Sequence, residues 1–278
     1  MKSNKKLLNK YMNLAIASAK IQSIKIKQPV GTYTLRPQIH LIIAGNRGTC
    51  KSTAITQVSN HFNQEPYNDI TAASLVGTID SDTKEVIEGA AWDNRNSVCC
   101  IDEFMFRDRA GRPVETINIL LSLMEGNQYY KRKLALKNKM PVKKQDGDCY
   151  FLVNDGQIEV KTNFSLIIGT MSKLKFSNIK LQAFLSRCIP IEWAPNELAI
   201  LDIATGNPLF DYEDLTPKNR EVTINKINYM EILEFVKSKN PDIGIYLRAI
   251  GDCCRIFAIL GRHDKELYED LIFRKNEF

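Results

Sequence analysis

The stretch QIHLIIAGNRGTCKSTAITQVSNHF, residues 38–62, decides the fold. Its first part is continuously apolar, which is typical of a strand in a parallel sheet that is covered on both faces. Its last part carries Ile55, Val58 and Phe62 at helical spacing. A loop with two glycines lies between them, at residues 45–52. A strand, a glycine loop and a helix in this order predict a site where backbone N–H groups surround phosphate oxygens at a helix N-terminus.

The loop itself, GNRGTCKS, predicts a nucleotide site with Mg²⁺, of the Walker A type. Lys51 supplies a positive charge for the outer phosphates, and the Ser52 hydroxyl can ligate the metal. The usual pattern, GxxxxGK[ST], has a second glycine where this chain has Cys50. We expect the nucleotide to contact the run Gly45, Asn46, Arg47, Gly48, Thr49, Cys50, Lys51, Ser52 and Thr53.

A second apolar run, SVCCIDEF at residues 97–104, ends in two acids, Asp102 and Glu103. Because sites in parallel sheets lie at the carboxyl ends of the strands, we expect these acids to lie near the glycine loop. Asp102 would hold Mg²⁺ or its water, and Glu103 would polarise the water that attacks the terminal phosphate. Four apolar residues before two acids is a weak signal alone, but together with the loop it predicts a nucleotide-hydrolysing site of the Walker B type.

The composition fits an ordinary globular protein: 278 residues, 44% hydrophobic and 25% charged, enough for one large domain or a core with a smaller lobe. No apolar run approaches the roughly 18 residues that a membrane helix needs, and the basic start lacks the apolar core of a signal peptide. We therefore expect a cytoplasmic protein with no membrane contact. The seven cysteines form no CxxC pair, which favours buried thiols over a zinc or redox site.

The formal charge of +6 is unevenly distributed. Residues 1–27 carry seven lysines and no acid, and residues 129–148 carry seven basic residues against two acids. Each basic segment fits either a polyanionic partner or an ordinary solvated surface.

With both motifs placed, the chain resembles the AAA+ core of the minichromosome maintenance (MCM) replicative helicases, from about Leu35 to Arg255. The MCM phosphate loop, GDPGTAKS, also has a small residue in place of the second glycine. RPQIHLIIAG and CCIDEF are similar to the family's RGDIHILLVG and CIDEF. The resemblance implies an α/β P-loop NTPase fold of AAA+ type, with a five-stranded parallel sheet between helices and a small all-helical lid. We expect an N-terminal basic helix and lead-in at 1–34, the nucleotide-binding core at 35–193 and the lid at 194–278.

Two segments resemble the family's DNA-facing elements. ITAASLVGTI and EGAAW, residues 70–79 and 88–92, are similar to the helix-2 insert, and LLSLMEGNQYYKRK precedes the position of the pre-sensor-1 hairpin. In this chain the hairpin region, residues 133–157, is longer and basic. The resemblance implies DNA contacts by Lys133, Lys137, Lys139, Lys143 and Lys144, the last two in a polar tip with Gly147.

Three further site residues follow from the resemblance. Thr170 ends the apolar run NFSLIIGTM where the family usually has a sensor 1 asparagine, and Arg248 aligns with the sensor 2 arginine. LQAFLSRCIPI is similar to the family's LLSRFDLI, which makes Arg187 an arginine finger for the ATP of the next subunit. The alternative for Arg187 is an arginine that caps the carbonyl groups of a helix end.

The implied function is that of a ring-shaped, hexameric ATPase that unwinds or moves along single-stranded or forked DNA in replication, without sequence preference, in an archaeal cell or a virus-infected host. The alternative is an ATP-switched loader or replication initiator that does not unwind DNA, which the lack of the family's flanking domains in this sequence favours. A third hypothesis is an inactive relative that keeps only the fold, on the evidence of Cys50 and Thr170. Ordinary P-loop kinases and GTPases fit less well.

Overall fold

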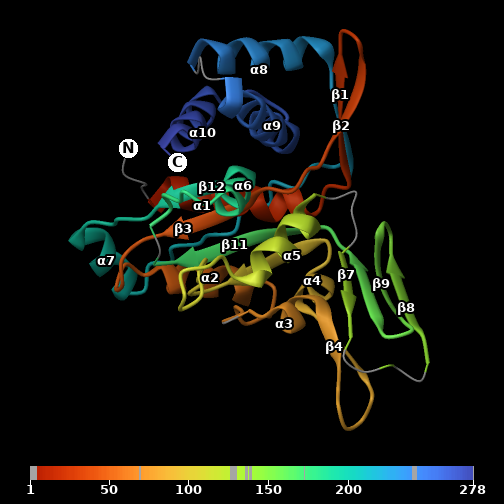
Figure 1. Ribbon diagram of the computed structural model, residues 1–278. Helices are drawn as coiled ribbons and strands as arrows, with labels where there is room; N and C mark the ends of the chain where they lie inside the picture. The colour runs from red at the N-terminus through yellow and green to blue at the C-terminus, as the bar shows by residue number, and fades with distance from the viewer. Residues whose placement is uncertain are drawn as a thin grey trace.

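A four-stranded parallel sheet forms the centre of the molecule (Figure 1). The computed structural model describes residues 5–68, 70–125, 130–134, 137, 140–171, 173–239 and 243–277. The strands follow one another across the sheet in the order β12 (Cys188–Glu192), β3 (His40–Ala44), β11 (Phe164–Thr170) and β6 (Ser97–Ile101). All three pairings are parallel, so the carboxyl ends of the strands share one edge of the sheet.

Helices cover both faces of this sheet, which explains the unbroken apolar runs of its strands. Leu41 and Ile43 of β3 pack into the cluster that includes α1 (Lys5–Ala19) and α2 (Lys51–His61). Their neighbours Ile42 and Ala44 pack into the opposite cluster. That second cluster includes residues of α3 (Ala72–Val76), α4 (Ala90–Asp93), α5 (Glu115–Met124) and α6 (Ile179–Arg187).

The expected fifth strand of the sheet is missing from the described residues. Beyond β6 the chain makes only a one-residue parallel bridge, from Tyr67 to Ile101. The Tyr67 N–H donates to the Cys100 carbonyl, and the Tyr67 carbonyl accepts the Asp102 N–H, each at 2.9 Å. Both backbone groups of Tyr67 are therefore paired with the β6 side of the sheet. Pro66 precedes the bridge and has no N–H to extend it. The prediction of five strands is therefore wrong for the described residues, which form four strands and this one bridge.

The N-terminal segment is part of the core, and the described part of the expected basic helix and lead-in at 1–34 forms one helix, α1, followed by two strands. α1 ends at Ala19, and nine consecutive residues, 11–19, are buried. The Ser18 hydroxyl lies 2.9 Å from that of Ser165 on β11. The next segment alternates, with Ile24 and Ile26 buried, and forms β1 (Ser23–Gln28). It pairs antiparallel with β2 (Gly31–Leu35).

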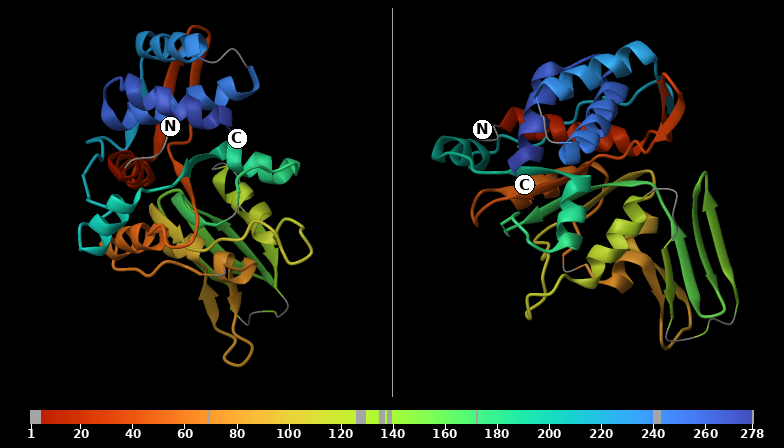
Figure 2. Two further views of the ribbon diagram at one scale, coloured as in Figure 1. Left: turned by 90° about the vertical axis from the view of Figure 1, so that its left-hand side faces the viewer. Right: turned by 45° about the horizontal axis from the view of Figure 1, so that its top comes forward.

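The resemblance implied an all-helical C-terminal lid, but this segment also contains a strand. It contains α7 (Glu197–Ala204), α8 (Lys226–Lys239), α9 (Ile243–Leu260), α10 (Lys265–Glu277) and the strand β13 (Glu221–Ile224). β13 has the β-branched residues Val222, Thr223 and Ile224 and adds to β1 in parallel. Helices α8, α9 and α10 gather on the side of the sheet that carries α1, as both views in Figure 2 show.

A β-rich module projects from the other side (Figure 1). It combines the hairpin of β4 (Gly77–Ile79) and β5 (Val86–Glu88) with an antiparallel sheet of β7 (Tyr130–Lys133), β10 (Gln157–Lys161), β9 (Cys149–Asn154) and β8 (Val142–Asp146). The long hairpin region that the sequence predicts, residues 133–157, thus supplies β8 and β9, two of the four strands of this sheet. None of the helices found in the described ranges combines the length and apolar character needed to cross a bilayer.

Candidate active site

The glycine loop connects β3 to α2 and turns through two left-handed residues, Gly48 at φ 73° and Cys50 at φ 61°. Cys50 is the N-cap of α2, and its side chain makes no capping hydrogen bond. A glycine at this position would adopt the left-handed conformation without strain. Cys50 therefore occupies the position of the second glycine of the usual motif and adopts the left-handed backbone conformation that this glycine has.

Lys51 is buried, and its ammonium group donates to the Asn46 carbonyl at 2.6 Å. Desolvation lowers the pKa of Lys51, and the nearby carboxylates of Asp102 and Glu103 oppose this effect. The lysine thus faces both acids from within the loop.

Trp193, the residue after β12, is hydrogen-bonded to the glycine loop and to the end of β3. Its indole N–H donates to the Thr49 carbonyl at 2.6 Å, and its backbone N–H donates to Ala44 at 2.7 Å. A Cβ on Gly45 would lie 2.4 Å from the Trp193 carbonyl oxygen, so only glycine fits there. Trp193 is not among the predicted site residues, and its only signal in the sequence is its position directly after an apolar strand.

The two acids follow β6 at the carboxyl edge of the sheet. Asp102 is 8% exposed, and its Oδ1 accepts the backbone N–H of Glu103 at 2.9 Å. Glu103 is exposed and has φ 53°, a left-handed conformation that turns the chain sharply after the strand. Asp102 therefore lies recessed at the wall of the cavity, and Glu103 projects above it.

β11 ends beside the acids. The Thr170 hydroxyl donates to the Phe104 carbonyl at 2.9 Å, which ties the end of the strand to the acidic loop. A Cβ on Gly169 would lie 2.7 Å from Asp102 Oδ1, so this glycine permits the close approach of the carboxylate. Sequence reasoning did not identify Gly169, although a glycine inside an apolar strand is a recognised sign of close backbone approach.

These elements enclose one cavity of about 360 Å³. Its walls are Arg47, Gly48, Thr49, Cys50, Lys51, Ser52, Thr53, Asp102, Glu103, Thr170 and Met171. The residues predicted from the loop and the acidic strand therefore meet, except that Gly45 and Asn46 form the base of the loop.

The donor set fits Mg²⁺. One hydroxyl, Ser52, and one recessed carboxylate, Asp102, share the cavity, and Mg²⁺ in nucleotide sites commonly takes few protein ligands together with phosphate oxygens and water. Within the described ranges no group of three or more His, Cys, Asp or Glu side chains forms an all-protein metal cage.

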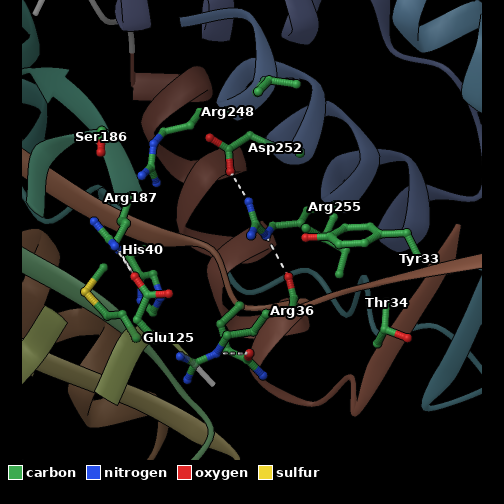
Figure 3. A pocket seen from close by; sticks show the side chains of 15 residues that line it. Tyr33, Thr34, Arg36, His40, Glu125, Ser186, Arg187, Arg248, Asp252 and Arg255 are labelled. Atoms are coloured by element: carbon green, nitrogen blue, oxygen red, sulfur yellow. Dashed lines mark hydrogen bonds and ion pairs between the residues drawn. The ribbon is translucent and has the colours of Figure 1, made fainter. Parts of the chain in front are cut away.

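Arg187 and Arg248 line a different cavity, of about 330 Å³ (Figure 3). Arg187 ends α6, donates to the Ala183 carbonyl at 2.7 Å and pairs with Glu125, whose Oε1 lies 2.8 Å from Arg187 Nε. Partial burial lowers the pKa of Arg248, and the neighbouring Arg187 lowers it further. Both arginines therefore face the same hollow, and the structure does not bring either one to the glycine loop.

The two cavities lie at opposite edges of the sheet. His40, the first residue of β3, lines the arginine cavity, and the glycine loop begins directly after Ala44, the last residue of the same strand. Four steps of roughly 3.3 Å separate these two strand ends by about 13 Å.

Comparison with known proteins supports the resemblance for part of the chain. Residues 8–135 match the family model described as the MCM P-loop domain. This match, which covers less than half of the chain, supports an MCM-like AAA+ protein. A stretch of 82 residues is 35% identical to the DNA replication licensing factor MCM4 of Drosophila melanogaster, and this alignment covers 27% of the chain and 10% of that relative. The chain therefore spans only a small part of the relative's length, and Arg187 and Arg248 lie outside the segment that matches the family model.

The predicted DNA-contacting lysines that the structure describes are spread over the β-rich module. Lys144 pairs with Glu88 of β5, and Lys137 lies 3.6 Å from Asp155. Lys143 is exposed and has no ion pair within the described residues, and strand alternation places it on the face opposite to Lys144. Lys133 is exposed at the end of β7, and Lys139 lies outside the described residues.

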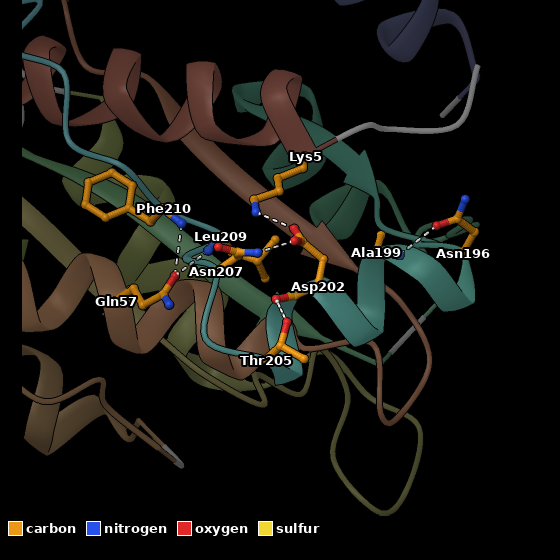
Figure 4. A network of polar contacts seen from close by, with 9 residues as sticks. All are labelled: Lys5, Gln57, Asn196, Ala199, Asp202, Thr205, Asn207, Leu209 and Phe210. Carbon is orange, nitrogen blue, oxygen red and sulfur yellow. Dashed lines mark hydrogen bonds and ion pairs between the residues drawn. The ribbon is translucent and has the colours of Figure 1, made fainter.

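The connection after Trp193 is fixed to α1 and α2 (Figure 4). Asp202 of α7 accepts from Lys5 of α1 at 2.8 Å. Gln57 of α2 accepts the backbone N–H groups of Leu209 and Phe210, each at 2.9 Å. These contacts join α7 to α1, and they join the segment after α7 to α2, the helix that begins with Lys51.

Proposed function

We propose that this MCM-like chain is an ATPase that binds ATP and Mg²⁺ at a seam between two of its own copies. One copy contributes the glycine loop with Lys51, Asp102 and Glu103, and its neighbour contributes Arg187 and Arg248. The assembly we propose is a hexameric ring that unwinds or translocates along DNA in replication.

The placement of the arginines at the edge of the sheet opposite to the loop carries this proposal. The two strand ends are about 13 Å apart, and the strand between them is buried. The arginines of one chain therefore do not reach the phosphates in its own loop. Two adjacent guanidinium groups that face a cavity suit a multiply charged anion such as a triphosphate. A second copy is the simplest source of that anion.

The residues of the chain divide the chemistry among themselves. The loop N–H groups and Lys51 hold the phosphates, and Glu103 accepts a proton from the water that attacks the γ-phosphorus. The bond from that phosphorus to the β,γ-bridging oxygen then breaks, which releases ADP and phosphate. Mg²⁺ held by Ser52 and Asp102 would neutralise phosphate charge. Arg187 of the neighbour would stabilise the charge that develops in the transition state.

The β-rich module supports the DNA-binding part of the proposal. The ion pair of Lys144 with Glu88 joins the β8–β9 sheet to the β4–β5 hairpin, so both extensions project on one side of the molecule. An exposed lysine such as Lys143 grips phosphates without reading the sequence of bases.

ATP turnover of the Arg187→Ala variant tests the seam. We expect a loss of about 10³-fold or more, because that is the usual contribution of an arginine finger, with nucleotide binding retained. Arg262→Ala, at an exposed position after α9, is the matched control and should keep full turnover. Full turnover at dilutions where light scattering detects only monomers would refute the proposal.

A forked-duplex assay separates helicase from loader. Strand separation that needs hydrolysed ATP supports unwinding. DNA loading with ATP or a slowly hydrolysed analogue, without strand separation, would instead support the ATP-switched loader.

A further inference from the structure

Lys275 of α10 is a buried cation with three partners. Its side chain is 5% exposed. The ammonium nitrogen lies 3.0 Å from the Ser186 carbonyl, 2.7 Å from the Cys188 carbonyl and 3.0 Å from Asp252 Oδ2. Because an ammonium group has three N–H donors, these contacts use all of them.

The two carbonyl groups belong to the residues on either side of Arg187. They lie where α6 ends and β12 begins. Ser186 is in the last turn of α6, whose carbonyls have no intrahelical partner, and Cys188 is the C-cap residue. Lys275 therefore fixes the backbone of the residue that we assign as the arginine finger, from an element more than eighty residues further along the chain.

Asp252 extends this contact to α9, the helix that carries Arg248. Its other oxygen accepts from Arg255 Nη1 at 2.5 Å, and Arg255 Nε donates to the Arg36 carbonyl at 2.8 Å (Figure 3). Arg248 precedes Asp252 by one turn of α9, so the two side chains share a face of the helix. The Lys275–Asp252 pair thus connects the backbone around Arg187 to the helix that carries Arg248.

The energetics of the pair favour a geometric role. Desolvation of two buried charges largely offsets their attraction, so a buried ion pair often adds little to stability compared with apolar side chains. Its directional hydrogen bonds, by contrast, restrict how α10, α9 and the end of α6 can move relative to one another.

We infer that Lys275 and Asp252 are positioning residues that hold Arg187 and Arg248 in the arrangement required by the triphosphate of the neighbouring copy. This inference rests on the proposed function, in which Arg187 acts on a neighbour. It predicts that Lys275 matters to the site of the next copy and not to the site in its own chain.

The test uses Lys275→Met, which keeps the length of the side chain and removes its charge. We expect turnover to fall about 10²-fold, the usual cost of a misplacement near 1 Å, with unchanged affinity for an ATP analogue. The control is Lys239→Met. Lys239 is a surface lysine of α8 that pairs with Glu269 of α10, the helix that carries Lys275, and turnover of this variant should not change.

Mixed assemblies separate positioning from a general structural role. Lys51→Ala chains have a defective loop but an intact arginine face, and Lys275→Met chains have the reverse. Mixed in equal amounts, the two defective variants should recover turnover, because about one interface in four pairs an intact loop with an intact arginine face. Damage that spreads through the Lys275→Met chain would not be rescued in this way.

The possible failures are distinguishable. Full turnover of Lys275→Met, or no recovery on mixing, would overturn the inference while an inactive Arg187→Ala variant leaves the proposed function in place. Full turnover of Arg187→Ala would refute the proposed function and the inference together. If Lys275→Met does not fold, the same tests apply to the double variant Lys275→Met/Asp252→Asn, which removes both buried charges.

Discussion

Gly169→Ala should damage the acidic side of the site from within the sheet. Gly169 is the penultimate residue of β11, and its carbonyl accepts the Phe104 N–H at 2.8 Å. An added Cβ would lie 2.4 Å from Ile55 Cδ1 and 2.7 Å from Asp102 Oδ1. Since carbon contacts are comfortable near 3.5 Å, each neighbour must retreat by roughly 1 Å.

The two neighbours give way differently. Ile55 is fully buried, so the new methyl group overpacks the core, at a cost of about 1–3 kcal/mol in the free energy of unfolding. Asp102 can move into the cavity, but its Oδ1 then leaves the Glu103 N–H, so both acids are displaced. We expect turnover to fall about 10²-fold, as for other misplacements near 1 Å. The Mg²⁺ concentration for half-maximal turnover should rise.

Phosphate release at increasing Mg²⁺ concentration and denaturant unfolding measure the two effects separately. Ile55→Val removes the Cδ1 atom, so in the double variant with Gly169→Ala we expect part of the stability to return but not the turnover. Gly206→Ala is the control for backbone strain, since Gly206 has φ 101° and no atom within 4 Å of an added Cβ. Normal turnover and normal Mg²⁺ dependence of Gly169→Ala would refute this account of Asp102.

Three further predictions concern other parts of the chain. Cys50→Gly should change the free energy of unfolding by less than about 1 kcal/mol, because relief of left-handed strain and the greater flexibility of the unfolded glycine chain nearly cancel. Cys50→Val should destabilise the protein, since a β-branched residue is strained at positive φ. Equal denaturation midpoints for both variants would contradict this. Lys143→Ala should weaken single-stranded DNA binding and reduce the dependence of log affinity on log salt concentration by about 0.7. Lys144→Ala should have a smaller effect, because Lys144 already pairs with Glu88. Equal effects of the two variants in a binding titration would argue against the assignment. Burial, reinforced by Arg36, keeps the pKa of His40 well below its ordinary value, so the unfolded chain takes up a proton that the folded chain does not. Stability should therefore decrease as the pH falls below about 6.5, by up to about 1.4 kcal/mol per unit, and thermal unfolding of His40→Asn should show a shallower dependence.

The sequence predicted the parts of the site that local chemistry determines. The glycine loop must present N–H groups next to a lysine, and the acids must follow a buried strand, so residue type and order were enough to bring Lys51, Asp102 and Glu103 together. The family match over residues 8–135 confirms the resemblance for this part of the chain. The roles of Thr170, Arg187 and Arg248 stay predictions.

The sequence did not reveal features that depend on distant contacts. α1 carries lysines at its start, which suggested a solvated helix, yet its burial depends on the sheet, α9 and the segment after α7. β13 is four residues long and becomes a strand only because β1 offers an edge. Lys275 gives no local sign of its role, because its partners come from α6, β12 and α9.

The placement of the two cavities at opposite edges of one sheet has a consequence for assembly. A two-fold dimer would join identical surfaces, so the proposed contact, which joins unlike surfaces, must be heterologous and run head to tail. An open row of such copies always leaves one loop without a donor and one arginine pair without a nucleotide. Only closure into a circle gives every copy both roles, so a broken circle would lose a catalytic centre at the break while keeping every polypeptide intact.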